Sequence, residues 1–303
     1  NLDPTVIVGS QIPEFGGNIR FGQSKIAVIE ADEYGRSFLN YQPSSAIVTN
    51  MDWDHVDTYP TFEHFKNAFQ EFVGKIPAEG TLVVNAEDPE SRALLKNTQA
   101  KIRTFGVSKG ETSATNLKIH LKIPGAHNRA NAAAAAAMAR SMGVDDKTIL
   151  QALENFSGLW RRQEVLGQYS QATVISDYAH HPREIAATLQ ALREAYPQQR
   201  LITVFQPHRK RRLQQFFTDF QTVLSNLDPL IVVDVYEPPG EDQHLQVSAH
   251  DLIAGRENEY IVYAPTWSET QAALNRLIRP NDVVVVLSAG DLDRHVRQLV
   301  TRL

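Results

Sequence analysis

The sequence of 303 residues contains no cysteine, which excludes a disulfide framework and any thiolate metal site. It has no apolar run near the roughly 18 residues of a membrane span, and its first residues do not resemble a signal peptide. Positive charge is not in excess: the formal net charge is −5, and no basic run extends beyond Arg209–Arg212. We therefore expect a cytoplasmic globular protein that binds neither nucleic acid nor a membrane.

The composition is ordinary for a globular protein, because 42% of the residues are hydrophobic and 21% are charged. Short apolar runs alternate with helical patterns, which predicts an α/β fold with parallel sheets. The expected strands are Lys25–Glu30, Ala46–Thr49, Thr81–Val84, Leu117–Ile123, Thr173–Ser176, Leu201–Phe205, Leu230–Asp234, Tyr260–Tyr263 and Asp282–Leu287. The expected helices are Thr61–Lys75, Asn128–Met142, Asp145–Asn155, Pro182–Ala195, Arg209–Ser225, Ala249–Gly255, Trp267–Leu277 and Asp293–Leu303.

A domain break is expected near Phe156–Arg162, where the string FSGLWRR follows a helix and precedes a new strand. The pattern after this break forms a complete strand–helix series, whereas the part before it has no phosphate loop ahead of its first expected strand. We therefore predict domains at residues 1–157 and 158–303. Because the first residue is Asn1, we also expect the chain to begin inside a longer gene product.

Acidic residues and a histidine follow the first two expected strands, in the strings IEADEYG and NMDWDHVDTY. Alternation along a strand places Glu30 and Asp32 on the same face. The second string adds Asp52, Asp54, His55 and Asp57. If the two strands are neighbours, a carboxylate and the His55 imidazole can share a divalent cation, and carboxylate oxygens suit Mg²⁺. The alternative is a solvated acidic turn that caps the next helix.

A helix start is expected in the string GAHNRAN at Gly125–Asn131. In one interpretation Asn128 caps this helix, because a short polar side chain satisfies its first N–H groups. In the other, Asn128 and Asn131 lie three residues apart on one helical face and present their amides to a heterocyclic base. The sequence favours neither interpretation over the other.

Imidazoles and an arginine follow two further expected strands, in the strings DYAHHP and VFQPHR. The first contains His180 and His181 before Pro182, and the second contains His208 and Arg209. Each string ends at an expected helix N-terminus, where anions are favoured, so the pair predicts a receptor for carboxylate or phosphate. A single histidine of this kind is alternatively a helix cap. A histidine-based metal site is also open, although the spacing lacks a zinc pattern.

Seven strings in this order resemble the Mur ligases, the ATP-dependent amide-forming enzymes of peptidoglycan precursor synthesis: IEADE, TNMDWDHVDTY, GAHNRANAAAA, FSGLWRR, DYAHHP, VFQPHR and DVYEPPGE. The resemblance implies an N-terminal Rossmann-like domain that binds the UDP-sugar, a central ATP-binding domain and a C-terminal amino-acid-binding domain. The expected fold is therefore a partial central ATPase-type parallel-sheet domain at residues 1–157. A Rossmann-like C-terminal domain is expected to follow at residues 158–303.

The resemblance also implies roles for individual residues. It implies a Mg²⁺ site formed by Glu30 and His55. The residues implied to contact ATP or its phosphates are His127, Asn128, Asn131, Arg162 and Tyr178. Those implied to contact the reacting phosphate and orient the incoming amino acid are Asp177, His180, His208 and Arg209. No single general base can be chosen from the sequence.

The C-terminal strings most resemble the branch that joins L-alanine to UDP-N-acetylmuramate through an acyl phosphate. The alternatives are the branch that recycles murein tripeptide, a folylpolyglutamate synthase, and a non-catalytic fragment of such a ligase. The family's UDP-binding domain and its Gly-rich phosphate loop with Lys and Thr do not occur in residues 1–303. We therefore expect this chain to be inactive without them. The oligomeric state and the amino acid that is added do not follow from the sequence.

Overall fold

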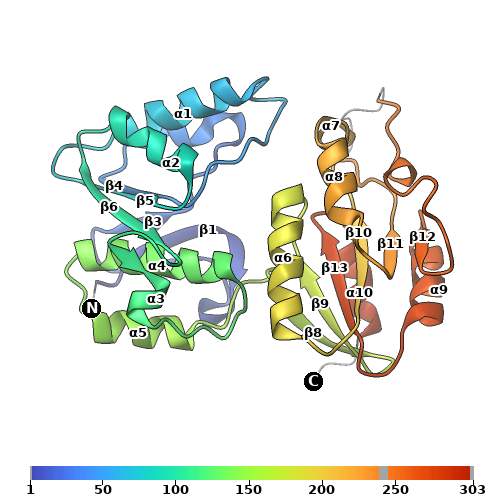
Figure 1. The fold of residues 1–303 in the computed structure, drawn as a ribbon. Coiled ribbons are helices and arrows are strands. Elements are labelled where there is room, and N and C mark those ends of the chain that lie inside the picture. Colours follow the sequence, from blue (N-terminus) through green and yellow to red (C-terminus); the bar gives the residue numbers. More distant parts are fainter. Residues whose placement is uncertain (1, 239–244, 301–303) are drawn as a thin grey trace. The chain divides into compact units, whose positions relative to one another are not determined.

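The computed structural model describes residues 2–238 and 245–300, and the chain forms two compact units, Asn1–Ser157 and Gly158–Leu303 (Figure 1). Strands and helices alternate in both units, and their main sheets are largely parallel. The predicted α/β class is therefore confirmed. No helix within the described residues has the length and apolar character needed to cross a membrane.

The main sheet of the first unit has four parallel strands in the order β4-β5-β6-β7. They are β4 (Ser45–Val48), β5 (Thr81–Asn85), β6 (Lys101–Gly106) and β7 (Thr112–Ser113). Side chains of β5 alternate between two buried cores. Leu82 and Val84 pack with helix α1 (Phe62–Gly74), whereas Val83 packs with the alanine run of helix α4 (Ala126–Ser141). The small alanines thus let α4 lie close against the sheet.

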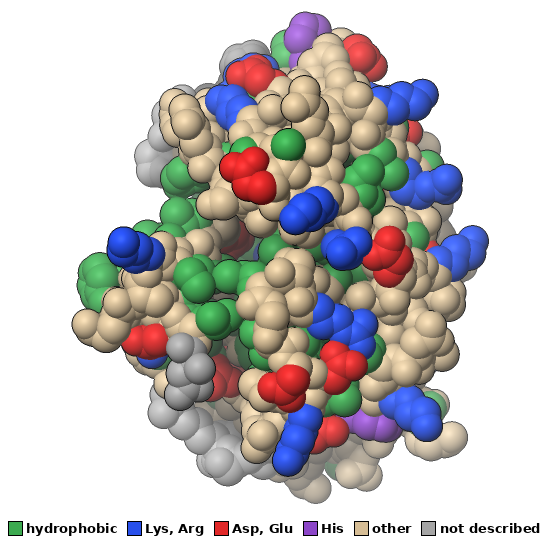
Figure 2. All heavy atoms as spheres, turned by 90° about the vertical axis from the view of Figure 1, so that its left-hand side faces the viewer, with side chains coloured by type: hydrophobic (Ala, Val, Ile, Leu, Met, Phe, Trp, Pro, Cys, Tyr) green, Lys and Arg blue, Asp and Glu red, His purple; other side chains and the backbone are tan. Residues whose placement is uncertain are grey.

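A second, smaller sheet in the first unit has the order β2-β1-β3. Its strands are β1 (Thr5–Ile12), β2 (Gly17–Arg20) and β3 (Ala27–Ile29), with β1 antiparallel to β2 and parallel to β3. Ile7, Ile19 and Val28 are between 40% and 49% exposed. Hydrophobic side chains also lie among charged ones on the face of the molecule that Figure 2 shows. Because β3 and β4 belong to different sheets, the expectation that the first two predicted strands are neighbours is wrong.

The strand predicted at Leu117–Ile123 is also wrong. Ser113 accepts a hydrogen bond from the N–H of Asn116 at 3.2 Å and so caps a short helix, α3 (Ala114–Leu117). Lys118 then adopts the left-handed conformation with φ 52°, which ends the helix, and Ile119 is buried in an irregular segment. The alternation of apolar and polar residues here reflects a loop that buries single side chains.

The other short elements of the first unit are η1 (Pro13–Phe15), η2 (Tyr34–Asn40), α2 (Pro89–Ala93) and η3 (Leu94–Asn97). Helix α5 (Asp146–Asn155) closes the unit against α4. Asp145 caps α5 by accepting a hydrogen bond from the N–H of Thr148 at 3.0 Å. The sequence correctly placed α1, α4 and α5.

The second unit contains one six-stranded sheet in the order β12-β11-β10-β13-β9-β8, in which β8 alone is antiparallel to its neighbour. The strands are β8 (Glu164–Tyr169), β9 (Ala172–Asp177), β10 (Leu201–Gln206), β11 (Leu230–Val232), β12 (Ile261–Tyr263) and β13 (Val283–Ser288). One face packs against α9 (Trp267–Leu277) and α10 (Leu292–Leu299). On the other side, Phe205 contacts Phe220 of α8 (Phe217–Leu224), which packs beside α6 (Pro182–Ala195).

Two predicted helices differ in extent from the observed ones, and the end of a third lies outside the described residues. The helix expected at Arg209–Ser225 divides into α7 (Lys210–Gln215) and α8, because Phe216 leaves the helical conformation. The segment Ala249–Gly255 contains only the 3-10 turn η4 (His250–Leu252). Residues 301–303, predicted as helix, and Pro239–Glu241 of the string DVYEPPGE lie outside the described residues.

Candidate functional site

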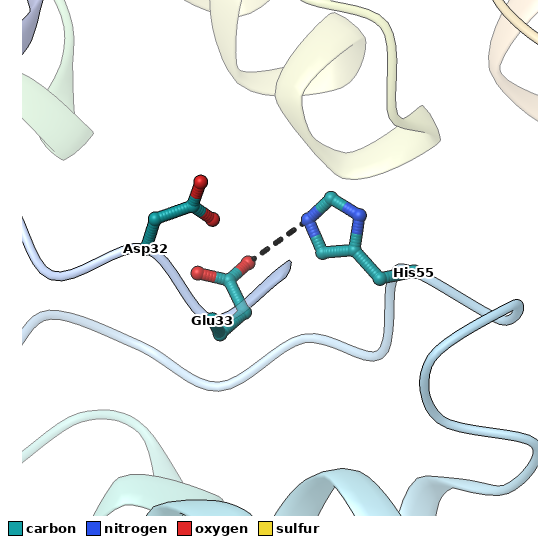
Figure 3. A group of neighbouring side chains, drawn as sticks. All are labelled: Asp32, Glu33 and His55. Atoms are coloured by element: carbon teal, nitrogen blue, oxygen red, sulfur yellow. Dashed lines mark ion pairs between the residues drawn. The ribbon is translucent and has the colours of Figure 1, made fainter. Parts of the chain in front are cut away.

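Two acids and one imidazole meet in the first unit, after β3 and after β4. Asp32, Glu33 and His55 each offer a ligand atom, and these atoms lie within 4.8 Å of one another. The Nε2 atom of His55 lies 3.2 Å from Oε1 of Glu33. Figure 3 shows the Glu33 carboxylate directed toward the imidazole of His55, with the Asp32 carboxylate beside it. Two carboxylates with one imidazole form a donor set that fits a divalent cation. We call this group the acid–imidazole cluster.

Tyr59 fixes the two loops of this cluster to each other. Its hydroxyl donates to the carbonyl oxygen of Glu33 at 2.6 Å, and its own N–H donates to the carbonyl of His55 at 2.8 Å. His55 adopts a positive φ of 53°, a conformation that non-glycine residues adopt at some cost and that is enriched at functional sites. The string NMDWDHVDTY contains Tyr59, but no sequence signal indicated this positioning role.

Burial keeps the Tyr59 hydroxyl protonated. The side chain is fully buried, and its burial, together with the negative charge of Glu33, raises the pKa of Tyr59 to about 12. A neutral hydroxyl remains a hydrogen-bond donor throughout the physiological pH range. The distance between the two loops is therefore held by a bond that does not titrate near neutral pH.

Glu30, the carboxylate predicted to share a cation with His55, is not part of the acid–imidazole cluster and contacts strand β1. Its Oε2 atom accepts a hydrogen bond from the N–H of Gly9 in β1 at 2.5 Å. A Cβ atom at Gly9 would lie 3.2 Å from that same oxygen, so the glycine permits this close approach. The structure thus brings Asp32 and Glu33 to His55, while Glu30 contacts β1.

The nucleotide-binding residues predicted at the start of α4 lie in its first two turns. The helix begins at Ala126 after Gly125, so the interpretation of Asn128 as the N-cap is wrong. Instead, the side-chain amide of Asn128 donates to the carbonyl of Pro124 at 2.7 Å. His127 is half-buried and Asn131 is exposed. Contacts of His127, Asn128 and Asn131 with a nucleotide therefore stay a prediction.

In the second unit, Asp177 ends β9 and is almost completely buried. Its two oxygens accept hydrogen bonds from the N–H groups of Gln163 at 2.9 Å and Ala179 at 2.7 Å. Burial raises the pKa of Asp177, and these backbone hydrogen bonds oppose that change. Asp177 therefore shapes the turn that carries Tyr178 and His180, which is a positioning role for this predicted catalytic residue.

The loop after Asp177 places two histidines in different surroundings. His181 is the N-cap of α6, and its buried ring packs edge-on against Phe216 at 4.8 Å between centroids. The Nδ1 atom of His180 lies 2.8 Å from the carbonyl oxygen of Tyr178. Glu184 accepts hydrogen bonds from the N–H groups of His180 at 3.1 Å and His181 at 3.2 Å. The helix-cap alternative thus holds for His181.

The loop after β10 carries His208 and Arg209 against the segment that follows β11. Arg209 donates its N–H to the carbonyl of Tyr236 at 2.9 Å and has a positive φ of 65°. The N–H of Lys210, the first residue of α7, donates to Glu237 at 2.5 Å. Near both helix starts the protein's own carboxylates, Glu184 and Glu237, accept hydrogen bonds from backbone N–H groups. The receptor for carboxylate or phosphate stays a prediction, and its histidine and arginine side chains are the groups that would contact the anion.

Four rings form a continuous row along this edge of the sheet. The Tyr178 and His180 centroids are 5.2 Å apart, His180 and His208 are 5.9 Å apart, and His208 stacks on Tyr236 at 5.5 Å. The loop from β13 to α10 lies beside this row, because a Cβ atom at Gly290 would approach Cγ of Tyr236 to 2.6 Å. We call this row, with Arg162 and Arg209, the imidazole–arginine edge.

Two consecutive arginines contact the row from the start of the unit. Arg162, the predicted ATP contact, is exposed, lies 5.5 Å from the Tyr178 centroid and has its Nη1 atom 3.6 Å from Glu184. Arg161 is buried, lies 4.9 Å from the same ring and donates to the carbonyls of Ser288 and Gly290. The sequence missed Arg161, because a pair of arginines does not show which one is buried.

The whole chain resembles known proteins. The profile of the Mur ligase middle domain matches residues 11–139, and the profile of the Mur ligase glutamate ligase domain matches residues 161–290. The UDP-N-acetylmuramate–L-alanine ligase of Desulforamulus reducens is 36% identical over 327 aligned positions, which cover 100% of this chain and 70% of that protein. The enzyme of the same name from Aquifex aeolicus is 37% identical over 97% of this chain and 68% of that protein.

Solved structures show the same arrangement. The UDP-N-acetylmuramate–alanine ligase of Thermotoga maritima superposes with a TM-score of 0.74 at 28% identity, covering 98% of this chain and 68% of that one. A murein peptide ligase from Psychrobacter arcticus gives a TM-score of 0.66 at 21% identity, covering 98% of this chain and 71% of that one. The second likeness concerns the fold alone.

Proposed function

The chain belongs to the Mur ligase family, and from this premise we propose that it is an ATP-dependent ligase that joins L-alanine to UDP-N-acetylmuramate in peptidoglycan precursor synthesis. The observation that carries the proposal is the 36% identity, over the whole chain, to a relative with that name. The geometry supports it, because the second unit gathers imidazoles and arginines at the carboxyl ends of parallel strands, where α/β proteins bind ligands.

The reaction proposed for the chain activates a carboxylate. ATP transfers its γ-phosphoryl group to the muramoyl carboxylate, and the amine of alanine then displaces phosphate from the acyl phosphate. In this scheme Arg209 pairs with the carboxylate of alanine, since guanidinium and carboxylate groups form charge-assisted hydrogen bonds. His208 precedes Arg209 in the chain, the ring of His180 lies 5.9 Å from that of His208, and Asp177 positions the loop that carries His180.

We assign nucleotide binding to His127, Asn128 and Asn131 in the first unit, and to Arg162 and Tyr178 in the second. Asn128 and Asn131 lie on one face of the first turns of α4. Arg162 lies over the ring of Tyr178, so the two side chains form one surface with a positive charge at its rim. This arrangement suits a phosphate group, although Glu184 shares the guanidinium.

A divalent cation, Mg²⁺ in this family's reaction, fits the acid–imidazole cluster. Asp32, Glu33 and His55 would hold it, and Glu30 remains the carboxylate that the sequence assigned to it. When bound, such an ion offsets negative charge on phosphate oxygens. The chain's own contribution is to hold the three donors together through Tyr59, whose hydrogen bond to Glu33 fixes one loop against the other.

The test is ligation by the purified gene product that contains these 303 residues. With ATP, L-alanine and UDP-N-acetylmuramate we expect release of phosphate. We also expect a product whose mass equals that of L-alanine plus UDP-N-acetylmuramate minus one water. Omission of any one substrate should abolish both signals. If murein tripeptide is joined and L-alanine is not, the recycling alternative replaces this proposal. If neither is joined, the chain is not a ligase of this pathway.

A further inference from the structure

The two histidines of the imidazole–arginine edge differ in what their Nδ1 atoms contact. In His180, Nδ1 lies 2.8 Å from the carbonyl oxygen of Tyr178 and 3.4 Å from Oε2 of Glu184. Both of these oxygens accept hydrogen bonds, the carbonyl always and the carboxylate whenever it is ionised. The proton of neutral His180 therefore lies on Nδ1, and Nε2 carries the lone pair.

His208 has the opposite arrangement. Its Nδ1 atom lies 3.3 Å from Nη1 of Arg212, and the same guanidinium nitrogen lies 3.3 Å from the carbonyl oxygen of His208. A guanidinium group only donates hydrogen bonds. Nδ1 of His208 therefore accepts, and its proton lies on Nε2. Arg212 is buried in the second unit, so this contact is not an exposed one that solvent replaces readily.

Neighbouring charges reinforce this difference. The positive charges of His180 and Arg162, with hydrogen bonds from N–H groups, lower the pKa of Glu184 in spite of its burial. A carboxylate beside His180 stabilises an imidazolium, whereas the guanidinium of Arg212 beside His208 disfavours one. Other charged groups on this edge include Arg161 and Arg162, which lie over Tyr178, and Glu237, which accepts a hydrogen bond from the N–H of Lys210.

Resting on the ligase function proposed above, we propose that His180 and His208 have opposite roles in amide formation. His180 accepts at Nε2 a proton from the ammonium group of the incoming amino acid. His208 donates a hydrogen bond from Nε2–H to an oxygen of the acyl phosphate. The pair follows the general rule that the partner of one ring nitrogen fixes the function of the other.

The protons of this step balance. An N–H bond of the ammonium breaks, its electron pair stays on nitrogen, and the proton moves to Nε2 of His180. The neutral amine forms the C–N bond with the acyl carbon, and the C–O bond to phosphate breaks with its electron pair on the phosphate oxygen. Nitrogen loses its second proton to the released phosphate. The imidazolium of His180 then returns its proton to solvent.

The tautomers can be measured without activity. Chain 1–303 with ¹⁵N-labelled histidine rings is recorded by long-range ¹H–¹⁵N correlation above the pKa of both rings, and His180→Gln and His208→Gln variants assign the signals. We expect the Nδ1–H form for His180 and the Nε2–H form for His208. Arg212→Met should remove the preference of His208 alone. The same tautomer in both rings, or the reverse assignment, overturns the proposal.

The roles are then separated by kinetics in the gene product that ligates. His180→Gln should lower kcat/KM for the amino acid by about 100-fold or more and remove the acidic limb of its pH profile, as expected for loss of a general base. A glutamine amide can donate a hydrogen bond, so His208→Gln should retain at least tenfold more activity than His208→Ala. The same amide cannot act as a base, so the activity of His180→Gln should not exceed that of His180→Ala. Circular dichroism checks the fold of each variant.

The outcomes distinguish this proposal from the function on which it rests. If the unaltered protein forms no amide from any substrate, the ligase function fails, and the tautomer measurement still decides the arrangement of the two rings. If ligation proceeds and His180→Gln keeps the acidic limb, the assignment of His180 as the base is wrong while the ligase function stands. An acidic limb lost in His208→Gln instead reverses the two roles.

Discussion

The two groups of candidate residues occupy similar places in their units but carry opposite charge. The acid–imidazole cluster of the first unit joins Asp32 and Glu33 to one imidazole, which favours a cation. The imidazole–arginine edge of the second unit brings His180 and His208 together, with Arg162 over Tyr178 and Arg209 next to His208 in the chain, which favours an anion. Strand ends thus offer a position for a site, and the residues placed there decide which charge it binds.

The units also differ in how they use their own carboxylates. In the second unit Asp177, Glu184 and Glu237 accept hydrogen bonds from backbone N–H groups, which shapes the loops around the rings. In the first unit Glu33 is instead paired directly with His55. At the candidate sites, the second unit thus uses its acids to hold its loops in place, whereas Glu33 of the first unit offers a ligand atom for a cation. The difference is confined to these sites, because Glu30 and Glu87 of the first unit also accept hydrogen bonds from backbone N–H groups.

The largest effect on stability is expected from Arg161, the buried arginine that joins Tyr178 of the imidazole–arginine edge to the loop after β13. Its guanidinium donates to the carbonyls of Ser288 and Gly290 and lies 3.8 Å from buried Asp293. Arg161→Met should destabilise the second unit by about 2–4 kcal/mol, because two carbonyls lose a charged donor, while Asp293 keeps Arg297 at 2.8 Å. Hydrogen exchange of the β9 and β13 amides measures this loss.

The matched control for Arg161 is Arg193→Met on α6, since Arg193 is exposed and donates only to a backbone carbonyl in the described contacts. It should change stability by less than about 0.5 kcal/mol. Slow exchange in β9 and β13 that survives Arg161→Met would show that the edge does not depend on the buried arginine.

The next effect distinguishes exposed Arg162 from half-buried Arg209. Arg209→Ala should raise the KM for L-alanine roughly ten- to hundredfold, because an Arg–carboxylate contact contributes ~1.5–3 kcal/mol, and should leave the KM for ATP nearly unchanged. Arg162→Ala should instead raise the KM for ATP. Initial rates at varied substrate concentrations measure both constants. If Arg209→Ala changes only the KM for ATP, Arg209 belongs to the phosphate side.

The smallest effect on stability is expected from Glu87 of the first unit, whose carboxylate accepts hydrogen bonds from the N–H groups of the loop at residues 107–109. Burial would raise the pKa of Glu87, but hydrogen bonds from the N–H groups of Val107, Ser108 and Lys109 lower it to about 2, against 4.5 for the free side chain. Because the folded-state pKa is lowered, the stability from this group is present above about pH 4.5 and is lost as the pH falls toward 2.

Glu87 is exposed, so solvent screening limits this contribution to about 1 kcal/mol. Urea unfolding of the first unit at about pH 6 and about pH 3 measures it. Glu87→Gln should reduce the difference between the two pH values, and the exposed control Glu79→Gln should not. An equal pH dependence in both variants would remove Glu87 from this role.

Parts of the fold follow from local sequence signals. Helices α6 and α9 begin and end at the predicted residues, because each has a capping box at its start, and α6 also has Pro182 at its first position. Strand β6 was missed because its first three residues are exposed and two of them are charged, so it shows no apolar run. Strands β1 and β2 were missed as well, since they form a separate small sheet with a partly exposed surface.

The candidate site was predictable where it depends on strand ends within one parallel sheet. His180 and His208 follow β9 and β10, whose shared neighbour β13 sets them in register, so their proximity was expected. The partners of His55 were not, because they depend on how the loops after two different sheets meet through Tyr59. The opposite surroundings of the two imidazoles arise from backbone carbonyls and Arg212, which no motif reveals.

The claim that the first unit binds a cation is tested most directly by titrating Mg²⁺ into chain 1–303 by calorimetry, with Mn²⁺ as a paramagnetic probe of the same site. We predict one divalent ion per chain, with affinity lowered at least about tenfold in Glu33→Gln and His55→Ala and unchanged in the exposed control His120→Ala. A loss in Glu30→Gln but not in Glu33→Gln would instead favour the pair predicted from the sequence. Equal Mg²⁺ and Mn²⁺ binding by all of these variants would contradict the cation site.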